Sequence, residues 1–213
     1  TVVTPTSRIT ALLLVVFTAS TLAFQRPSRS PNGRRQPDAT RAVTVGHRTR
    51  TYHVHTPRSR RPQPLPLLIA LHGGGGSGLQ MQRNYGFDEL ADREGFIVAY
   101  PNGTGRLRQI GLTWNGGTCC GYALDQQVDD VAFLRAMVAD AVREFPVDRS
   151  RIYVTGHSNG GMMAHRFARE AADLVAAAAP VAGATLDLAA RPSRAVPLMH
   201  IHSVNDPRAA WDG

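Results

Sequence analysis

Short, nearly continuous apolar segments alternate along this chain with segments whose apolar residues recur at the spacing of a helix. The apolar segments predict strands at 65–71, 96–100, 151–155, 174–182 and 197–202. The helical segments between them are 79–94, 125–145 and 159–171. Near the start, residues 42–45 and 50–56 alternate in polarity like a hairpin or a pair of edge strands. Buried strands that alternate with helices predict an α/β fold, in which a mainly parallel sheet carries helices on both faces.

The most informative segment, residues 151–164, joins one of these strands to the next helix through a G-x-S-x-G turn. Gly156 and Gly160 keep side chains out of a turn so tight that Ser158 adopts a strained backbone angle. Such a turn pushes the serine hydroxyl out of the sheet toward solvent. The pattern therefore predicts Ser158 as a nucleophile, and the alternative is an ordinary serine in a strand-to-helix turn.

A serine nucleophile needs a base, an acid that orients the base, and N–H donors for the oxyanion. The N–H of Asn159 follows the serine at the start of a helix and is one expected donor. The glycine run 73–76 after the strand 65–71 is expected to supply the other donor, from Gly74 or Gly75. Asp206 follows the last predicted strand after a short turn and is the expected acid, with a helix-capping or surface aspartate as the alternative.

No histidine follows Asp206 in this sequence, although the base comes after the acid in the chain order of such sites. Among the eight histidines, His202 is the least unsuitable substitute, and a polar residue at a strand end is its alternative interpretation. We therefore expect the chain to be a C-terminally truncated piece whose catalytic histidine lies beyond Gly213.

The net charge of +8 is concentrated ahead of the predicted domain. Ten arginines and one acid lie between residues 25 and 62, whereas 13 arginines and 15 acids follow. Because the basic excess belongs to an N-terminal segment, we expect no nucleic acid partner and an uncharged or weakly charged substrate.

Residues 1–24 have the features of a secretory signal peptide, because Arg8 precedes an apolar run at 11–22 and small residues suited to cleavage. A retained membrane anchor or an extra core helix is the alternative, but the run is too short to span a bilayer as a helix. Residues 25–41, rich in Arg, Pro and Ser, are expected to be a flexible linker, and 42–213 the catalytic domain. We expect a secreted protein with no stable membrane insertion after the signal is removed.

The only two cysteines, Cys119 and Cys120, are adjacent on a long loop expected at 104–123. In an exported protein either they form a bridge with each other or one of them pairs with a cysteine outside this sequence. Two adjacent thiolates do not make a tetrahedral metal site, so no metal is expected. Trp114 on the same loop either lines the site or is a buried structural residue.

Together these features resemble the polyhydroxybutyrate depolymerase family of esterases, which includes the feruloyl and acetylxylan esterases of carbohydrate esterase family one. The resemblance covers residues 42–213 and rests on five segments in the same order, at 71–78, 100–103, 113–121, 128–134 and 151–164, while 200–206 is similar to the family's acid loop. It implies an α/β-hydrolase fold, an exported carboxylic ester hydrolase without a cofactor, and a further cysteine and histidine beyond Gly213. Residues 208–211 depart from the family's pattern after the acid, which leaves the substrate preference open.

The resemblance implies a serine mechanism with an acyl-enzyme, acting on polyhydroxyalkanoate-type esters or on feruloyl and acetyl esters of polysaccharides. Besides Trp114, His72 and His157 are expected to contact the substrate. A serine peptidase or a dienelactone-type hydrolase is an alternative, because the fold and the serine turn do not fix the bond that is cleaved. An inactive fragment or a binding module that lacks the histidine is another alternative.

Overall fold

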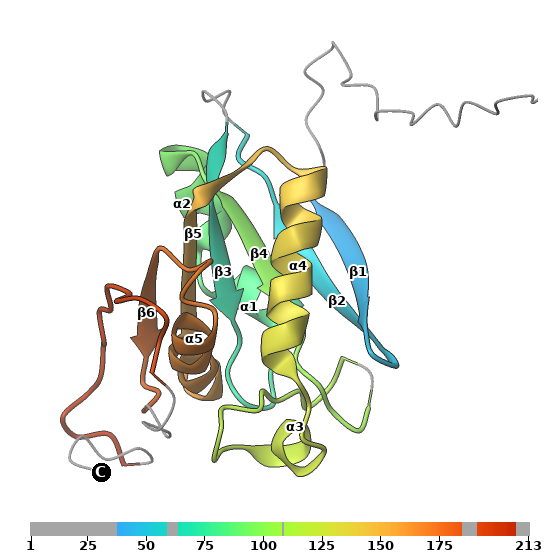
Figure 1. Cartoon of the computed structure of the whole chain (residues 1–213), viewed down its shortest axis with the longest axis vertical. Coiled ribbons are helices and arrows are strands. Elements are labelled where there is room, and N and C mark those ends of the chain that lie inside the picture. Colours follow the sequence, from blue (N-terminus) through green and yellow to red (C-terminus); the bar gives the residue numbers. More distant parts are fainter. Residues whose placement is uncertain (1–37, 59–63, 108, 185–190, 208–213) are drawn as a thin grey trace, which may run out of the picture. The chain divides into compact units, whose positions relative to one another are not determined.

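The computed structural model describes residues 38–58, 64–107, 109–184 and 191–207 (Figure 1). The chain divides into two units, Thr1–Arg34 and Arg35–Gly213, and every described residue belongs to the second. The expected signal peptide and most of the expected linker lie outside the described residues. Residues 39–41, which we also expected in the linker, instead form the start of the first strand.

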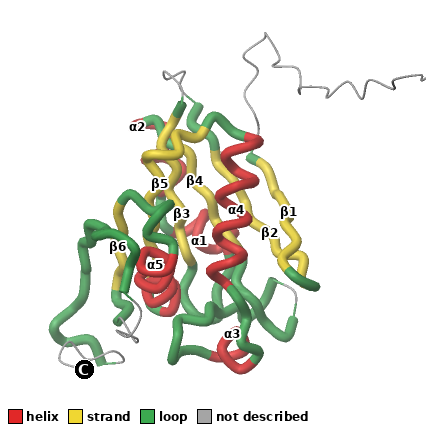
Figure 2. The backbone as a smooth tube through the Cα atoms, in the orientation of Figure 1, coloured by secondary structure: helices red, strands yellow, loops and turns green. Residues whose placement is uncertain are grey.

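Six strands form one sheet in the order β1-β2-β4-β3-β5-β6 (Figures 1 and 2). Their bounds are Ala39–Val45 for β1, Arg48–His55 for β2, Leu65–Leu71 for β3, Ile97–Pro101 for β4, Val147–His157 for β5 and Ala177–Val181 for β6. β1 and β2 form the expected hairpin, and β2 is also antiparallel to β4. The pairs β3–β4, β3–β5 and β5–β6 are parallel, so these four strands end at the same edge of the sheet. The predicted, mainly parallel sheet is confirmed.

Helices cover both faces of this sheet. The longer helices, α4 (Asp130–Glu144) and α5 (Asn159–Glu170), supply side chains to the larger apolar cluster. α1 (Gly78–Asn84) and α2 (Phe87–Glu94) supply Met81 and Ala91 to a second, smaller cluster. The short helix α3 (Gly121–Asp125) lies in the loop that leads to α4 (Figure 2).

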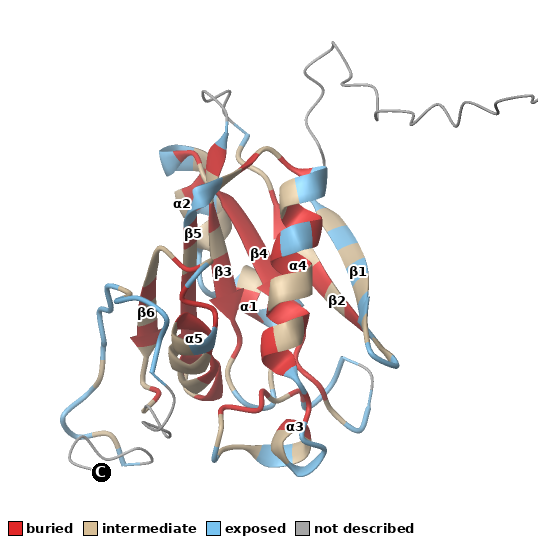
Figure 3. Ribbon diagram, in the orientation of Figure 1, coloured by how far each residue is buried: buried red, intermediate tan, exposed pale blue. Residues whose placement is uncertain are grey.

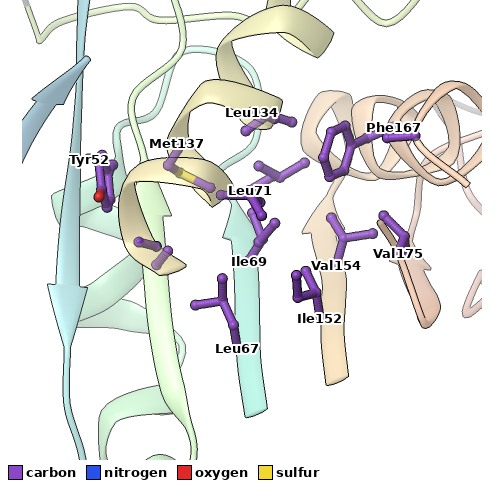
Figure 4. Close-up of a cluster of buried hydrophobic side chains, with 14 of the residues drawn as sticks. Tyr52, Leu67, Ile69, Leu71, Leu134, Met137, Ile152, Val154, Phe167 and Val175 are labelled. Atoms are coloured by element: carbon purple, nitrogen blue, oxygen red, sulfur yellow. The ribbon is translucent and has the colours of Figure 1, made fainter. Parts of the chain in front are cut away.

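The core is built from strand residues that alternate between the two faces of the sheet. Figure 4 shows side chains of the larger cluster, with β3 and β5 facing α4 and α5; its fully or almost fully buried members include Leu67, Ile69, Leu71, Leu134, Met137, Ile152, Val154 and Phe167. The intervening residues Ala70, Val98 and Tyr100 belong to the smaller cluster on the other face. Burial is therefore concentrated in the central strands and the inward faces of the helices (Figure 3).

Two predicted helices differ from the structure at their boundaries. The segment 79–94 forms two helices because Gly86 adopts a left-handed conformation, with φ of 69°, and ends the first of them. The segment 125–145 becomes helical again only at Asp130, where the side chain of Asp129 accepts a hydrogen bond of 2.8 Å from the N–H of Ala132. Asp129 is therefore an N-cap, as its place at the helix start suggested.

The predicted strand at 197–202 is only partly formed. Leu198 and Ile201 make single parallel bridges to Ala178 and Val181 of β6, without a continuous ladder. The segment nevertheless continues the sheet in the parallel sense and leads to Asp206 at the same edge as the ends of β3 and β5. Among the described residues, no helix is long and apolar enough to cross a membrane.

Candidate active site

Ser158 lies between β5 and α5 with φ of 55° and ψ of −120°, in the left-handed half of backbone space that non-glycine residues rarely adopt. Its N–H is fixed by the carbonyl of Val181 at 2.9 Å, which ties the turn to the end of β6. A Cβ on Gly156 would collide with the carbonyl of Gly160, and one on Gly160 would collide with the carbonyls of Leu71 and His72. The turn therefore has the strained, glycine-dependent geometry that the sequence predicted.

Two backbone N–H groups lie beside this serine. Asn159 is the first residue of α5, so its N–H has no acceptor within the helix. Gly74 lies next to it, because a Cβ built on Gly74 would be 3.5 Å from the Cβ of Asn159, and its N–H has no acceptor among the described residues. The N–H of Gly75, in contrast, donates to the carbonyl of Leu112 at 2.8 Å. Of the two glycines expected as alternative donors, this geometry favours Gly74, because the N–H of Gly75 is already bonded.

The side chain of Asn159 holds the long loop against the serine turn. Its Oδ1 accepts from the N–H of Trp114 at 2.8 Å, and its Nδ2 donates to the carbonyl of Trp114 at 2.9 Å. The indole Nε1 of Trp114 donates to the carbonyl of His72 at 2.9 Å. Trp114 is fully buried, which favours the alternative of a structural tryptophan over a contact with substrate.

His72 is likewise a structural residue. Its Nε2 accepts from the N–H of Gly103 at 3.0 Å, its Nδ1 lies 2.8 Å from the carbonyl oxygen of Gly73, and only 2% of the residue is exposed. Burial lowers the pKa of His72 to about 4, and the nearby charge of Arg50 lowers it further, against the raising effect of the Gly73 carbonyl. This geometry disfavours the expected contact of His72 with substrate, because the ring is enclosed by the loops that it joins.

His157 is half-buried beside the serine turn, where it remains a candidate for substrate contact. Its Nδ1 lies 3.3 Å from the hydroxyl of Tyr85, and the two rings are 6.2 Å apart. Tyr85, at the end of α1, is 44% exposed. The sequence analysis missed Tyr85, and no local pattern could have found it, because it meets His157 only through the packing of α1 near the end of β5.

Asp206 is held by a histidine from the preceding segment. Its Oδ2 lies 3.4 Å from Nε2 of His202, whose side chain is 2% exposed. Nδ1 of His202 lies 3.2 Å from Nε2 of His200. Both ring nitrogens of His202 thus face partners other than Ser158, which disfavours His202 as the base for the serine and makes it a neighbour that orients Asp206.

A second group of polar side chains lies near the amino end of β4, away from the strand ends that carry Ser158. Asp38, His55 and Asp88 bring ligand atoms of the kind that bind a metal ion within 4.8 Å of one another. His55 pairs with Val98 near the start of β4, far along the strand from the loop that follows Pro101. Nδ1 of His55 lies 2.9 Å from Asp38 and its Nε2 lies 3.0 Å from Asp92, so the group is a hydrogen-bonded network around a buried imidazole.

The long loop also carries the two cysteines. Cys119 and Cys120 are joined to each other by a disulfide bond, the first of the two alternatives that the sequence left open. Their segment is tied back to the loop by a hydrogen bond from the N–H of Gly116 to the carbonyl of Cys119.

Known proteins share parts of this sequence and fold. A bifunctional acetylxylan esterase/xylanase of Neocallimastix patriciarum is 32% identical over 125 residues, which are 59% of this chain and 17% of that protein. A feruloyl esterase B of Piromyces equi is 34% identical over 128 residues, which are 56% of this chain and 22% of that protein. The chain therefore spans less than a quarter of the length of either relative.

Solved structures show the same fold. An acetyl xylan esterase from Aspergillus awamori matches with a TM-score of 0.55 and 24% identity, over 68% of this chain and 52% of the other. A thermostable esterase matches with a TM-score of 0.64 and 20% identity, over 82% of this chain and 48% of the other. These matches confirm the α/β-hydrolase fold. Residues 50–213, more than half of the chain, match the family model described as esterase PHB depolymerase, and the chain therefore belongs to the PHB depolymerase family of esterases.

Proposed function

We propose that this protein is a secreted carboxylic ester hydrolase that uses Ser158 as its nucleophile. One observation carries the proposal: Ser158 has φ of 55° at the end of β5, next to the N–H groups of Asn159 and Gly74. That backbone angle is costly for a serine, and such strain is retained where it presents a reacting group. A structural serine in a strand-to-helix turn would gain nothing from it.

In the proposed reaction, the hydroxyl oxygen of Ser158 attacks the ester carbonyl carbon and its proton passes to a general base. The N–H groups of Asn159 and Gly74 stabilise the negative charge that develops on the carbonyl oxygen. The bond to the leaving alcohol then breaks as the base returns the proton to the alcohol oxygen, which leaves an acyl-enzyme. Water attacks the acyl-enzyme with the help of the same base, releases the acid and restores the serine.

Asp206 is proposed to orient that base, for which the family resemblance implies a histidine. Asp206 follows a segment that runs parallel to β6, so it lies at the same edge of the sheet as Ser158. His202, at 3.4 Å, and the hydrogen bond from the N–H of Asp206 to the carbonyl of Ser203, at 3.2 Å, hold the carboxylate in place.

The proposed substrates are acylated polysaccharides, with acetyl and feruloyl esters first. The names of the relatives carry this choice, since they include an acetylxylan esterase and a feruloyl esterase. The exposed ring of Tyr85 beside His157 supports it, because aromatic rings near a serine turn suit both a feruloyl group and the apolar face of a sugar.

Hydrolysis of 4-nitrophenyl acetate, methyl ferulate, hydroxybutyrate oligomers and peptide amides tests the proposal. Ser158→Ala should lower kcat/KM on the preferred ester by at least about 10³-fold, because the nucleophile and its base act as a unit. The matched control is Ser150→Ala, since Ser150 is exposed and bonded to Asp148 near the start of β5. Equal hydrolysis by Ser158→Ala and the wild type would exclude Ser158 as nucleophile, and faster cleavage of the amides would favour a peptidase.

A further inference from the structure

A polar cavity of about 450 Å³ lies between the start of β2 and the loop that follows β4. Its lining includes Arg48, Arg50, Asn102, Thr104, Gln109 and Leu112. The volume falls within the range of about 300–1,000 Å³ that is typical of small-molecule sites.

The cavity opens at the edge of the sheet that carries Ser158. Asn102 and Gly103 directly follow β4, whose carboxyl end lies at the same edge as those of β3 and β5. Leu112, which lines the cavity, accepts the N–H of Gly75 and forms a bridge with Gly76. One side of the cavity is thus the same segment that holds the glycine loop beside Ser158.

The lining is positively charged and rich in hydrogen-bonding groups. It contains two arginines, and none of its described members is an aspartate or a glutamate. Arg50 is paired with Asp130 at 2.7 Å, whereas Arg48 forms no ion pair with any described residue.

Two of the lining residues carry buried polar atoms without a partner. Thr104 is 9% exposed and Arg50 is 6% exposed. The hydroxyl of Thr104 and Nε of Arg50 make no hydrogen bond with any described residue. Buried polar groups are almost always hydrogen-bonded, since leaving them unpaired is costly. A hydroxyl-rich ligand that reaches into this cavity would supply such a partner.

We propose that the cavity is a subsite for a carboxylate-bearing sugar of the polymer, so that the substrate is an acylated acidic polysaccharide. The inference rests on the proposed esterase function and adds the charge of the chain that the enzyme recognises. Arg48 forms a charge-assisted hydrogen bond with the sugar carboxylate, a geometry that suits guanidinium. Thr104 and Gln109 bond to sugar hydroxyls, while an acyl group farther along the same polymer lies at Ser158.

A matched pair of acetylated xylo-oligosaccharides, one with a glucuronic acid substituent and one without, tests the proposal. The wild type should show a kcat/KM about tenfold higher on the acidic member, as expected for one hydrogen bond between charged groups. Arg48→Gln should reduce this ratio to near one. The ratio should also fall with added salt, because the site is open to solvent.

Arg149→Gln is the matched control, since it removes the same charge from an exposed position near the start of β5. It should keep the preference for the acidic substrate. Equal rates of the wild type on both oligosaccharides, or an undiminished preference in Arg48→Gln, would overturn the subsite.

A binding measurement distinguishes failure of the proposed subsite from failure of the proposed esterase function. Calorimetric titration of Ser158→Ala with the acidic and the neutral oligosaccharide reports the subsite without turnover. Tighter binding of the acidic one, lost in Ser158→Ala/Arg48→Gln, would support the subsite even if the wild type cleaved no ester. No difference in binding, together with normal hydrolysis of 4-nitrophenyl acetate, would reject the subsite alone.

Discussion

The side-chain amide of Asn159 is hydrogen-bonded to both the N–H and the carbonyl of Trp114, at 2.8 and 2.9 Å. Asn159 is 3% exposed and follows the candidate nucleophile directly. Through this pair of bonds, the residue that supplies one oxyanion donor also fixes the loop whose indole is bonded to His72. The serine turn, the long loop and the glycine loop are therefore one hydrogen-bonded unit.

Asn159→Ala should lose both bonds and leave the buried N–H of Trp114 unpaired, while the carbonyl of Trp114 keeps only the N–H of Cys120 at 3.4 Å. We expect a loss of about 1–3 kcal/mol in the free energy of unfolding, which is the cost of one unpaired buried group. The value of kcat on 4-nitrophenyl acetate should fall as well, because the N–H groups of Asn159 and Gly74 are then no longer held in fixed positions relative to each other. Urea unfolding and initial rates measure the two effects.

Asn159→Asp is the informative companion, because it keeps the acceptor for the Trp114 N–H and loses only the donor to the carbonyl. Asn84→Ala, at an exposed position at the end of α1, should change stability by less than about 0.5 kcal/mol. If Asn159→Ala were no less stable than Asn84→Ala, the proposed unit would not exist.

Gly160→Ala should be among the most damaging single changes to this chain. Its Cβ would collide with the carbonyls of Leu71 and His72, which are backbone atoms of β3 and the following loop that cannot move aside cheaply. We expect a loss of about 3 kcal/mol or more in stability, measured by urea unfolding, with a fall in soluble yield. Gly46→Ala is the control, since Gly46 has φ of 57° but a Cβ added to it would meet no atom within 4 Å. The backbone strain alone should lower the free energy of unfolding by about 1 kcal/mol. Similar losses in the two variants would show that β3 and α5 pack less closely than described.

Much of the fold and the serine turn could be predicted from the sequence because both depend on local patterns. The spacing of apolar residues predicted β3, β4 and β5 to within a few residues, and the requirement for glycine at 156 and 160 predicted the strained serine. The break at Gly86 was missed, because an isolated glycine within a helical pattern is tolerated in many helices.

The site expectations that the structure disfavours concern contacts between distant segments. Whether Gly74 or Gly75 is the donor is decided by Leu112, which lies far along the chain and accepts one of the two N–H groups. His72 is buried because the loop after β4 folds over it and the N–H of Gly103 bonds to its ring. Residue type and spacing carry no signal for such contacts, so a histidine beside a glycine loop was assigned to the substrate.

The buried His72 should make the stability of the protein depend on pH. Its pKa is about 4 in the folded state, against 6.5 in the unfolded chain, because burial disfavours the charged ring. Below pH 6.5 the unfolded chain binds a proton that the folded protein does not, so stability is complete above that pH and falls as the pH drops toward 4. Between pH 7 and pH 5 this single group should remove about 2 kcal/mol from the free energy of unfolding.

His72→Gln, which keeps a neutral acceptor near Gly103, should lower stability at pH 7 and flatten this pH dependence. His47→Gln, at an exposed position, should leave the wild-type dependence unchanged. Urea unfolding at several pH values between 5 and 7 measures both. The same slope in His72→Gln as in the wild type would show that folding does not lower the pKa of His72.

Arg50 and Asp130 form a buried ion pair, 2.7 Å apart, that joins β2 to the start of α4. Arg50 also lies over the ring of Phe133 and donates to the carbonyl of Asn102 at 3.0 Å, while Asp130 accepts the N–H of Asn115 at 2.8 Å. Burial raises the pKa of the Asp130 carboxyl, and the charge of Arg50 together with the Asn115 N–H opposes that rise. Burial likewise lowers the pKa of Arg50, against the opposing charge of Asp130.

Removing one partner of this pair should therefore lower the free energy of unfolding by far more than the intact pair contributes to it. Asp130→Asn leaves the charge of Arg50 buried and uncompensated, and we expect a loss of about 3–5 kcal/mol in the free energy of unfolding. Arg50→Met/Asp130→Leu removes both charges and should be more stable than Asp130→Asn. The exposed pair Arg135–Asp173 is the control, since Asp173→Asn should cost no more than about 1 kcal/mol. Urea unfolding measures all three variants, and a cost for Asp130→Asn as small as that for Asp173→Asn would mean that solvent reaches the Arg50 guanidinium.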